Sequence, residues 1–172
     1  GQTDWNRALR WQGAEADNEL NATGLEQARS VRNWFLSHQL QPSAVITSPL
    51  KRAVMTAECL ASAFAREVMR EPAFKEVGLG EFEGRTTDEL KREYGEQFEQ
   101  WLGSYHLLAP PGGENLDQAI KRMRDPLAEH IRAHRDGTVI VAHQAILMAM
   151  KAVLSGDQSV ATLATYKQAT HE

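Results

Sequence analysis

An uninterrupted run of β-branched and apolar residues, Thr138-Val139-Ile140-Val141-Ala142, constrains the fold of this chain more than any other feature. A strand with one face in solvent alternates apolar and polar residues, whereas a strand covered on both faces does not. The run therefore predicts a strand at the centre of a sheet, with helices on both faces. A second short run, Ala44-Val45-Ile46-Thr47, predicts another strand of the same sheet.

Helical periodicity fills most of the chain around these two runs. Helices are expected in five segments, which cover residues 23–41, 53–64, 86–102, 116–131 and 146–155. We expect a capping box at Thr23-x-x-Glu26, and a kink or a break in the fourth helix at Pro126. The polar residues 1–22 and the glycine-rich residues 71–86 predict loops. Alternating strands and helices favour a three-layer α/β sandwich with a mostly parallel sheet.

Composition limits the kind of protein that this chain can be. A length of 172 residues predicts one domain, and a net charge of −4 argues against a protein that binds nucleic acid through its phosphates. The single cysteine, Cys59, allows no intramolecular disulfide and no cysteine cluster for a metal, as is usual in the cytoplasm. The sequence shows neither a membrane-spanning apolar stretch nor the pattern of a signal peptide. We therefore expect a cytoplasmic protein that acts without membrane or nucleic acid.

Two cationic or titratable residues follow the predicted strands. Arg52 lies where the helix after Ala44–Thr47 begins, and His143 ends the second strand just before another helix. Open α/β sheets bind ligands beyond the carboxyl ends of their strands, where helix N-termini also favour anions. The pair predicts a site for phosphate or a carboxylate. Each residue also has a plainer interpretation, Arg52 as a surface ion-pair residue and His143 as a hydrogen-bonded structural group.

A series of short motifs resembles the histidine phosphatase superfamily, which includes the cofactor-dependent phosphoglycerate mutases. In chain order the motifs are Gly1-Gln2-Thr3-Asp4-Trp5-Asn6, Trp11-Gln12-Gly13, residues 17–20, Gly24 with Gln27-Ala28, residues 47–53, Glu76 with Gly80 and Glu83-Gly84, Pro111-Gly112-Gly113-Glu114, and Val141-Ala142-His143. Each motif alone is weak, but their order covers nearly the whole chain. The resemblance implies a phosphoglycerate mutase-like fold in a single domain over residues 1–172.

The family signature is Arg-His-Gly, and the sequence begins at its glycine. The resemblance implies that the nucleophilic histidine, the arginine and a central strand precede Gly1, and that a last strand also lies outside the sequence. Three explanations stay open: a chemically modified residue before Gly1, a cleavage there, or a molecule that lacks the nucleophile. A fold without its central strand would expose hydrogen-bonding edges, so we expect the nucleophile to exist upstream.

The resemblance also implies roles for individual residues. Arg52 and His143 would clamp the phosphoryl group with positive charge and hydrogen-bond donors, and Glu76 would be the general acid and later the general base. Without the motif, Glu76 is a solvent-exposed loop carboxylate. The phosphate- or substrate-binding residues implied are Gly1, Asn6, Gln12, Gly13, Arg52, His143 and Gln144. The family chemistry needs no metal and no cofactor.

These inferences favour a metal-independent phosphomonoesterase that acts on a small phosphorylated metabolite through a phosphohistidine. Glu76 is followed after a short loop by the next helix, whereas the mutases are similar but carry longer insertions around the substrate. A phosphoglycerate mutase is the second interpretation, and a catalytically inactive anion-binding module is the third. The sequence leaves a homodimer open.

Overall fold

The computed structural model describes residues 1–134 and 137–156 and contains a parallel sheet of three strands. The strands are β1 (Ala44–Thr47), β2 (Val68–Arg70) and β3 (Thr138–Val141), in the order β2-β1-β3. Val45 pairs with Val68 on one side and with Val139 on the other. The strand over Ala44–Thr47 is confirmed, as is the second strand except for Ala142, which lies just beyond β3. The predicted domain over residues 1–172 extends beyond the described residues.

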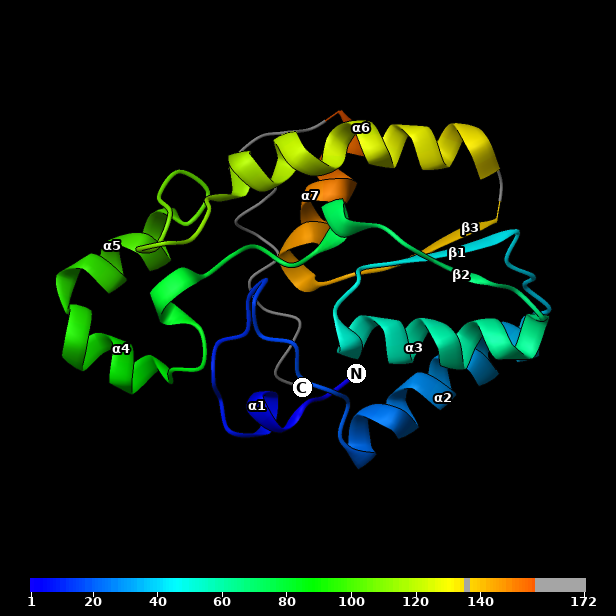
Figure 1. Cartoon of the computed structure of the whole chain (residues 1–172), viewed down its shortest axis with the longest axis horizontal. Coiled ribbons are helices and arrows are strands. Elements are labelled where there is room, and N and C mark those ends of the chain that lie inside the picture. Colours follow the sequence, from blue (N-terminus) through cyan, green and yellow to red (C-terminus); the bar gives the residue numbers. More distant parts are fainter. Residues whose placement is uncertain (135–136, 157–172) are drawn as a thin grey trace.

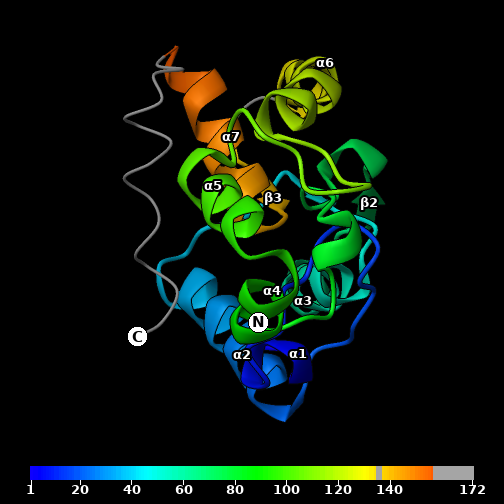
Figure 2. The ribbon, with the colours of Figure 1, turned by 90° about the vertical axis from the view of Figure 1, so that its left-hand side faces the viewer.

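Helices cover both faces of the sheet, which confirms the predicted three-layer sandwich. The helices are α1 (Asp4–Arg7), α2 (Ala22–Ser37), α3 (Lys51–Ala61), α4 (Thr87–Tyr94), α5 (Glu96–Ser104), α6 (Leu116–His134) and α7 (Gln144–Ser155). Figure 1 shows α6 and α7 on one side of the strands and α2 and α3 on the other, and Figure 2 shows the same layers from the side. The strands run toward α4, α5 and the N-terminal segment, so these elements surround the carboxyl ends of the sheet.

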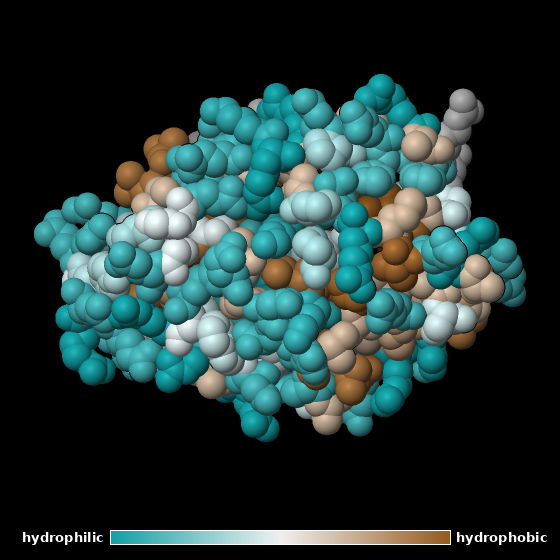
Figure 3. Space-filling model, in the orientation of Figure 1, coloured by the Kyte–Doolittle hydropathy of each residue, from teal (hydrophilic) through white to brown (hydrophobic). Residues whose placement is uncertain are grey.

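Two groups of buried side chains hold the layers together. The larger core lies on the α6 and α7 side of the sheet and includes Phe82, Phe98 and Met123, each fully buried. A smaller group, made of Val45, Ala57 and Ala61, joins β1 to α3. The surface over these layers is mostly hydrophilic on the face drawn in Figure 3. None of the helices in the described ranges has the length and apolar character needed to cross a bilayer.

Both faces of β3 are covered, as its apolar run predicts. Ile140 packs against the larger core and Val141 against the smaller one. All four residues of β1 are buried and β1 has a neighbour on each side, whereas β3 is half-buried and pairs with β1 in the sheet of described residues.

The start of α2 also differs from the predicted capping box. The N-cap is Asn21, whose side-chain oxygen accepts a hydrogen bond of 2.9 Å from Gly24 N. The helix therefore begins at Ala22, which places Thr23 inside its first turn. Asparagine and threonine both cap helices well, so Asn21 and Thr23 were both candidates. Asn21 occupies the N-cap position in the structure.

Other differences are small. The predicted loop over residues 1–22 contains the short helix α1, which has its own capping box between Thr3 and Asn6. Strand β2 was not predicted, because its three residues are too few to show a period. Helix α6 runs through Pro126 without a break, and Met123 and Leu127 on either side of the proline are buried in the core. Packing on both sides of a proline can offset the cost of the lost hydrogen bond.

Candidate active site

The site is built where β1 and β3 end. Ser48 follows β1 and His143 follows β3, and the two strands are neighbours in the sheet. Both side chains are buried, and His143 Nε2 lies 2.7 Å from Ser48 Oγ. Ser48 N also donates to Val141 O over 3.0 Å, which fixes the chain direction after the strand. The sheet register therefore brings together two polar groups that are 95 residues apart in the sequence.

His143 is neutral at neutral pH in this arrangement. Burial lowers its pKa from 6.5 to about 3, with smaller contributions from the charges of Arg52 and Arg122. A buried imidazole next to cations gains nothing from a further positive charge. Burial therefore disfavours the positive charge that was predicted for His143. The ring can still supply a hydrogen-bond donor.

Ser48 determines which ring nitrogen of His143 is free to donate. Ser48 Oγ accepts a hydrogen bond of 3.3 Å from Leu50 N, so its hydroxyl hydrogen is available to His143 Nε2. We infer that the hydrogen of the neutral ring lies on Nδ1, since one nitrogen accepts while the other donates. His143 then offers a single N–H in a fixed orientation.

Arg52 is a buried cation at the start of α3. Its Nη2 donates to Gly13 O over 3.1 Å and its Nη1 donates to Ala16 O. Burial lowers the pKa of Arg52, while the Glu76, Glu83 and Asp17 carboxylates act in the opposite direction. The guanidinium thus ties the loop that contains Gly13 to the sheet edge. Only two of its five N–H donors are used in these two bonds.

Glu76 lies between Arg52 and the first turn of α7. Its Oε1 accepts a hydrogen bond of 2.9 Å from Val77 N and its Oε2 accepts one of 3.3 Å from Ala145 N. Desolvation of the carboxyl group raises the pKa of Glu76, and this effect is opposed by the backbone N–H groups and by the Arg52 charge. Glu76 is therefore not the exposed loop carboxylate of the plainer interpretation. A raised pKa makes a carboxyl group better able to hold a proton and then give it up.

The helix N-termini at the site already hold carboxylates of the chain itself. Asp17 Oδ1 accepts a hydrogen bond of 2.7 Å from Lys51 N at the start of α3, and Glu76 does the same for Ala145 N in α7. The sequence predicted that these helix ends would favour an external anion. In the structure their first N–H groups are partly satisfied from within.

The other predicted binding residues fall into two groups. Gly13 is buried and its carbonyl accepts a hydrogen bond from Arg52, and Gly1 lies against Gly24 of α2. Asn6 and Gln12 instead bond to Thr3, since Asn6 Oδ1 accepts from Thr3 N over 2.9 Å and Gln12 Oε1 accepts from Thr3 Oγ1 over 2.9 Å. Gln144 is exposed at the first position of α7.

Three residues at the site escaped the sequence interpretation. Ser48 follows its strand as His143 does, so its position was a usable signal. Arg122 and Glu114 form an ion pair of 2.6 Å that also binds the backbone on either side of Glu76. Glu114 belongs to the Pro111–Glu114 motif, but nothing in the sequence pairs it with Arg122, which lies on α6, 46 residues from Glu76.

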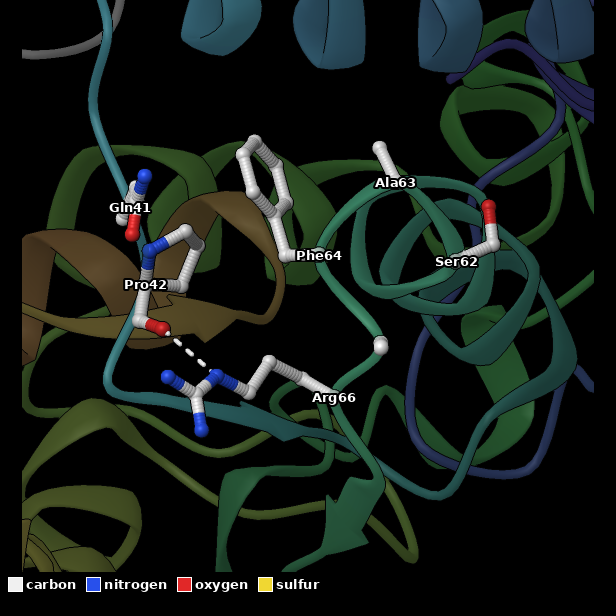
Figure 4. Close-up of a pocket in the computed structure, with 7 residues that line it drawn as sticks. Gln41, Pro42, Ser62, Ala63, Phe64 and Arg66 are labelled. Atoms are coloured by element: carbon white, nitrogen blue, oxygen red, sulfur yellow. Dashed lines mark hydrogen bonds between the residues drawn. The ribbon is translucent and has the colours of Figure 1, made fainter.

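A separate hollow lies away from these residues. It has a volume of about 340 Å³ and is lined by Gln41, Pro42 and residues 62–66. Figure 4 shows Arg66 beside it, with the guanidinium Nε donating to Pro42 O over 3.0 Å. These residues precede β1 and β2, so the hollow is at the amino ends of the strands, opposite the site. Within the described part of the chain, no group of three or more His, Cys, Asp or Glu side chains is arranged to hold a metal.

Comparisons with known proteins agree with this geometry. The chain is 31% identical to phosphoserine phosphatase 1 of Hydrogenobacter thermophilus over 156 residues, which are 90% of this chain and 72% of that protein. It is 34% identical to the metal-independent phosphoserine phosphatase of Arabidopsis thaliana, over 87% of this chain and 63% of that protein. The solved structure of mycobacterial glucosyl-3-phosphoglycerate phosphatase superposes with a TM-score of 0.84 at 27% identity, over 95% of this chain and 80% of that one.

Sequence and geometry thus lead to one family. Residues 1–171 match the profile of the histidine phosphatase superfamily, branch 1. The match starts at Gly1 and includes Arg52, Glu76 and His143, the residues that the fold gathers at the sheet edge. The chain belongs to the histidine phosphatase superfamily.

Proposed function

We propose that this chain is part of a metal-independent phosphomonoesterase that hydrolyses a small phosphorylated metabolite. The observation that carries the proposal is that the Arg52 charge acts on both His143 and Glu76, and that Glu76 Oε2 accepts a hydrogen bond from Ala145 N, two residues after His143. An arginine, a neutral imidazole donor and a carboxyl group with a raised pKa are the groups that phosphoryl transfer to a nitrogen nucleophile requires. The phosphatases among the relatives support the same reaction class.

The nucleophile in this proposal is a histidine immediately before Gly1. Its imidazole nitrogen attacks phosphorus, a P–N bond forms, and the P–O bond to the leaving group breaks. Glu76 gives its proton to the departing oxygen. A water molecule then attacks the phosphohistidine, Glu76 takes up a proton from that water, and the P–N bond breaks to release orthophosphate.

Arg52 and His143 act on the phosphoryl oxygens in both steps. Charge in the transition state is spread over these oxygens, so a cation and an oriented N–H group stabilise it directly. The Ser48 contact orients the His143 ring for this purpose, because it occupies Nε2 and leaves the Nδ1 hydrogen to donate. The positive charge comes from Arg52 and from an arginine of the upstream segment.

The test of the proposal is turnover by the full-length protein in EDTA. We expect p-nitrophenyl phosphate to release orthophosphate at mildly acidic pH, and phosphoglycerates to yield no isomer. Formation of an isomer without net orthophosphate would identify a mutase instead. An intact mass that shows no histidine before Gly1, with no turnover of either substrate, would identify an anion-binding module.

A substitution at Glu76 tests the role of its carboxyl group. In Glu76→Gln we expect kcat/KM, which reports on the phosphorylation step alone, to fall by about 10²-fold or more for an alkyl phosphate, whose leaving oxygen needs a proton. The loss for p-nitrophenyl phosphate should be much smaller, because nitrophenolate leaves without one. Steady-state kinetics with both esters gives the comparison. Equal losses for the two esters would contradict the assignment of Glu76 as proton donor.

A further inference from the structure

The ion pair between Arg122 and Glu114 holds the backbone that carries Glu76. Glu114 follows the Pro110–Gly113 turn and Arg122 lies in the second turn of α6. Arg122 Nη2 lies 2.6 Å from Glu114 Oε1, and Arg122 Nε lies 3.2 and 3.1 Å from Oε1 and Oε2. Both side chains are largely buried, with exposed fractions of 27% and 21%. The geometry is a two-pronged contact of the kind that only an arginine makes with a carboxylate.

The remaining donors and acceptors of the pair converge on one segment. Arg122 Nη2 donates to Lys75 O over 2.9 Å and to Glu76 O over 3.0 Å, while Nη1 donates to Ala73 O. On the other side of Glu76, Glu114 Oε1 accepts a hydrogen bond of 3.1 Å from Gly78 N. The two side chains therefore hold the segment 73–78 before and after Glu76.

An ordinary surface ion pair does not have this arrangement. Exposed ion pairs contribute little to stability and do not fix the conformation of a backbone segment. Here a single guanidinium satisfies three carbonyl groups of one irregular segment, where no strand or helix ladder can do so. The Glu76 side chain extends from the middle of this segment, and its carboxylate accepts hydrogen bonds from Val77 N and Ala145 N. A displacement of about 1 Å at such a residue can reduce a rate by about a hundredfold.

We propose that Arg122 and Glu114 are positioning residues that hold the Glu76 carboxyl group where it can protonate the leaving oxygen. The inference rests on the proposed function, since it assigns a purpose to the placement of Glu76 within that reaction. The pair touches the Glu76 backbone and acts on the reaction only through it. The turn over residues 110–113 then serves to bring Glu114 to this segment, and is not required to cover the substrate.

The kinetic experiment compares Arg122→Lys and Glu114→Gln with the parent in the full-length protein. Lysine keeps the charge of Arg122 but lacks the planar guanidinium that donates several hydrogen bonds at once. Glutamine keeps the shape of Glu114 but lacks its charge. We expect kcat/KM, which reports on the phosphorylation step, to fall about tenfold or more for an alkyl phosphate and by less than about threefold for p-nitrophenyl phosphate. Equal losses for the two esters, or no loss for either, would overturn the proposal.

Arg10→Lys is the matched control. Arg10 also donates to a backbone carbonyl, that of Gly84, and pairs with Glu89 Oε2 over 3.0 Å, but it holds the loop before α4 and not the Glu76 segment. We expect this variant to leave the ratio of the two kcat/KM values as in the parent. A change of that ratio in Arg10→Lys equal to the change in Arg122→Lys would show a general effect of loosened loops and would also overturn the proposal.

A second measurement separates failure of this inference from failure of the proposed function. Amide hydrogen exchange at Val77 and Ala145 reports on the carboxylate of Glu76, because both N–H groups donate to it. We expect exchange at both amides to be faster in Arg122→Lys than in the parent and unchanged in Arg10→Lys. If the parent hydrolyses neither ester, the proposed function fails. Exchange then decides the positioning role alone, and protection as in the parent would refute it.

Discussion

His143 combines a buried ring with a hydrogen bond to Ser48, and its protonation therefore depends on folding. In the unfolded chain the ring has a pKa near 6.5, whereas burial lowers the pKa to about 3 in the folded protein. Between these values the unfolded chain binds more protons, so acidification through this window favours unfolding. Above pH 6.5 the contribution of His143 to stability is fully present.

We expect the free energy of unfolding to fall by about 2 kcal/mol from this residue between pH 7.5 and 5.0, at about 1.4 kcal/mol per unit below 6.5. Urea unfolding of the parent and of His143→Asn at the two pH values measures the effect. The variant keeps a polar partner for Ser48 but has no titrating ring. The difference between the two proteins isolates His143 from the raised pKa of Glu76, which acts with the opposite sign. A parallel pH dependence in both proteins would contradict a neutral, buried His143.

The same residue should matter for turnover. In His143→Ala the phosphoryl oxygens lose one oriented donor, so we expect kcat to fall on the order of 10²- to 10³-fold. Single-turnover release of orthophosphate from p-nitrophenyl phosphate is the measurement, with thermal unfolding as the check that the variant is folded. A folded variant with an ordinary rate would remove His143 from the site.

Single residues show where sequence reasoning succeeds and where it stops. The positions of Arg52 and His143 beyond strand ends were predictable, because the end of a strand is visible in the sequence. The charge state of His143 was not predictable, since it depends on the packing that surrounds the ring. Arg122 was not predictable either, because its partners are backbone atoms of a distant segment.

Among the elements, the start of α2 gives a direct test. Asn21 caps the helix through Gly24 N, while Thr23 is an exposed residue inside the first turn. We expect Asn21→Ala to lower the free energy of unfolding by about 1 kcal/mol, and Thr23→Ala to change it by only a few tenths. Chemical denaturation of both variants measures the two effects. A larger loss of unfolding free energy in Thr23→Ala than in Asn21→Ala would support the capping box that the sequence predicted.

The elements also show which sequence signals are strong. The start of a helix at residue 86 was predicted, and the structure has a capping box there, with Thr86 N donating to Glu89 Oε2 over 2.8 Å. The same spacing at Thr23 and Glu26 failed because Asn21 precedes it and competes for the same backbone N–H groups. A spacing rule identifies a helix start to within a turn, and the neighbouring residues decide the position within that turn.

For the molecule as a whole, a close backbone contact joins the N-terminal segment to α2. A Cβ atom added at Gly24 would lie 2.1 Å from Gln2 O, and one added at Gly1 would lie 2.5 Å from Gly24 O. Side chains cannot fit there, so the glycine allows the first residues to lie against the helix near the site. Gly103 in α5 differs, because an added Cβ would meet no atom within 4 Å.

We expect Gly24→Ala to lower the free energy of unfolding by about 1 to 3 kcal/mol, because the two backbones must separate. Gly103→Ala should raise it by about 0.5 to 1 kcal/mol, since alanine favours the helix. Thermal or urea unfolding gives both values. Equal effects in the two variants would argue against the contact between Gln2 and Gly24.

The order of the strands was the part of the architecture that the sequence could not provide. Layering follows from alternating strands and helices, and the structure confirms it. Strand order depends on which pairs form, and the apolar runs in β1 and β3 are too alike to rank. The burial of β1 between two neighbours follows from pairing with β2, a strand that left no periodic signal.

The carboxylates of Asp17 and Glu76 at the N-termini of α3 and α7 have a consequence for how a phosphate ester arrives. A dianion that approaches Arg52 brings two negative charges close to Glu76, and like charges so placed make the carboxylate hold its proton more tightly. Capture of the ester is then linked to uptake of a proton from solvent. In the proposed reaction, binding of the substrate would thereby cause Glu76 to be protonated before the bond to the leaving group begins to break.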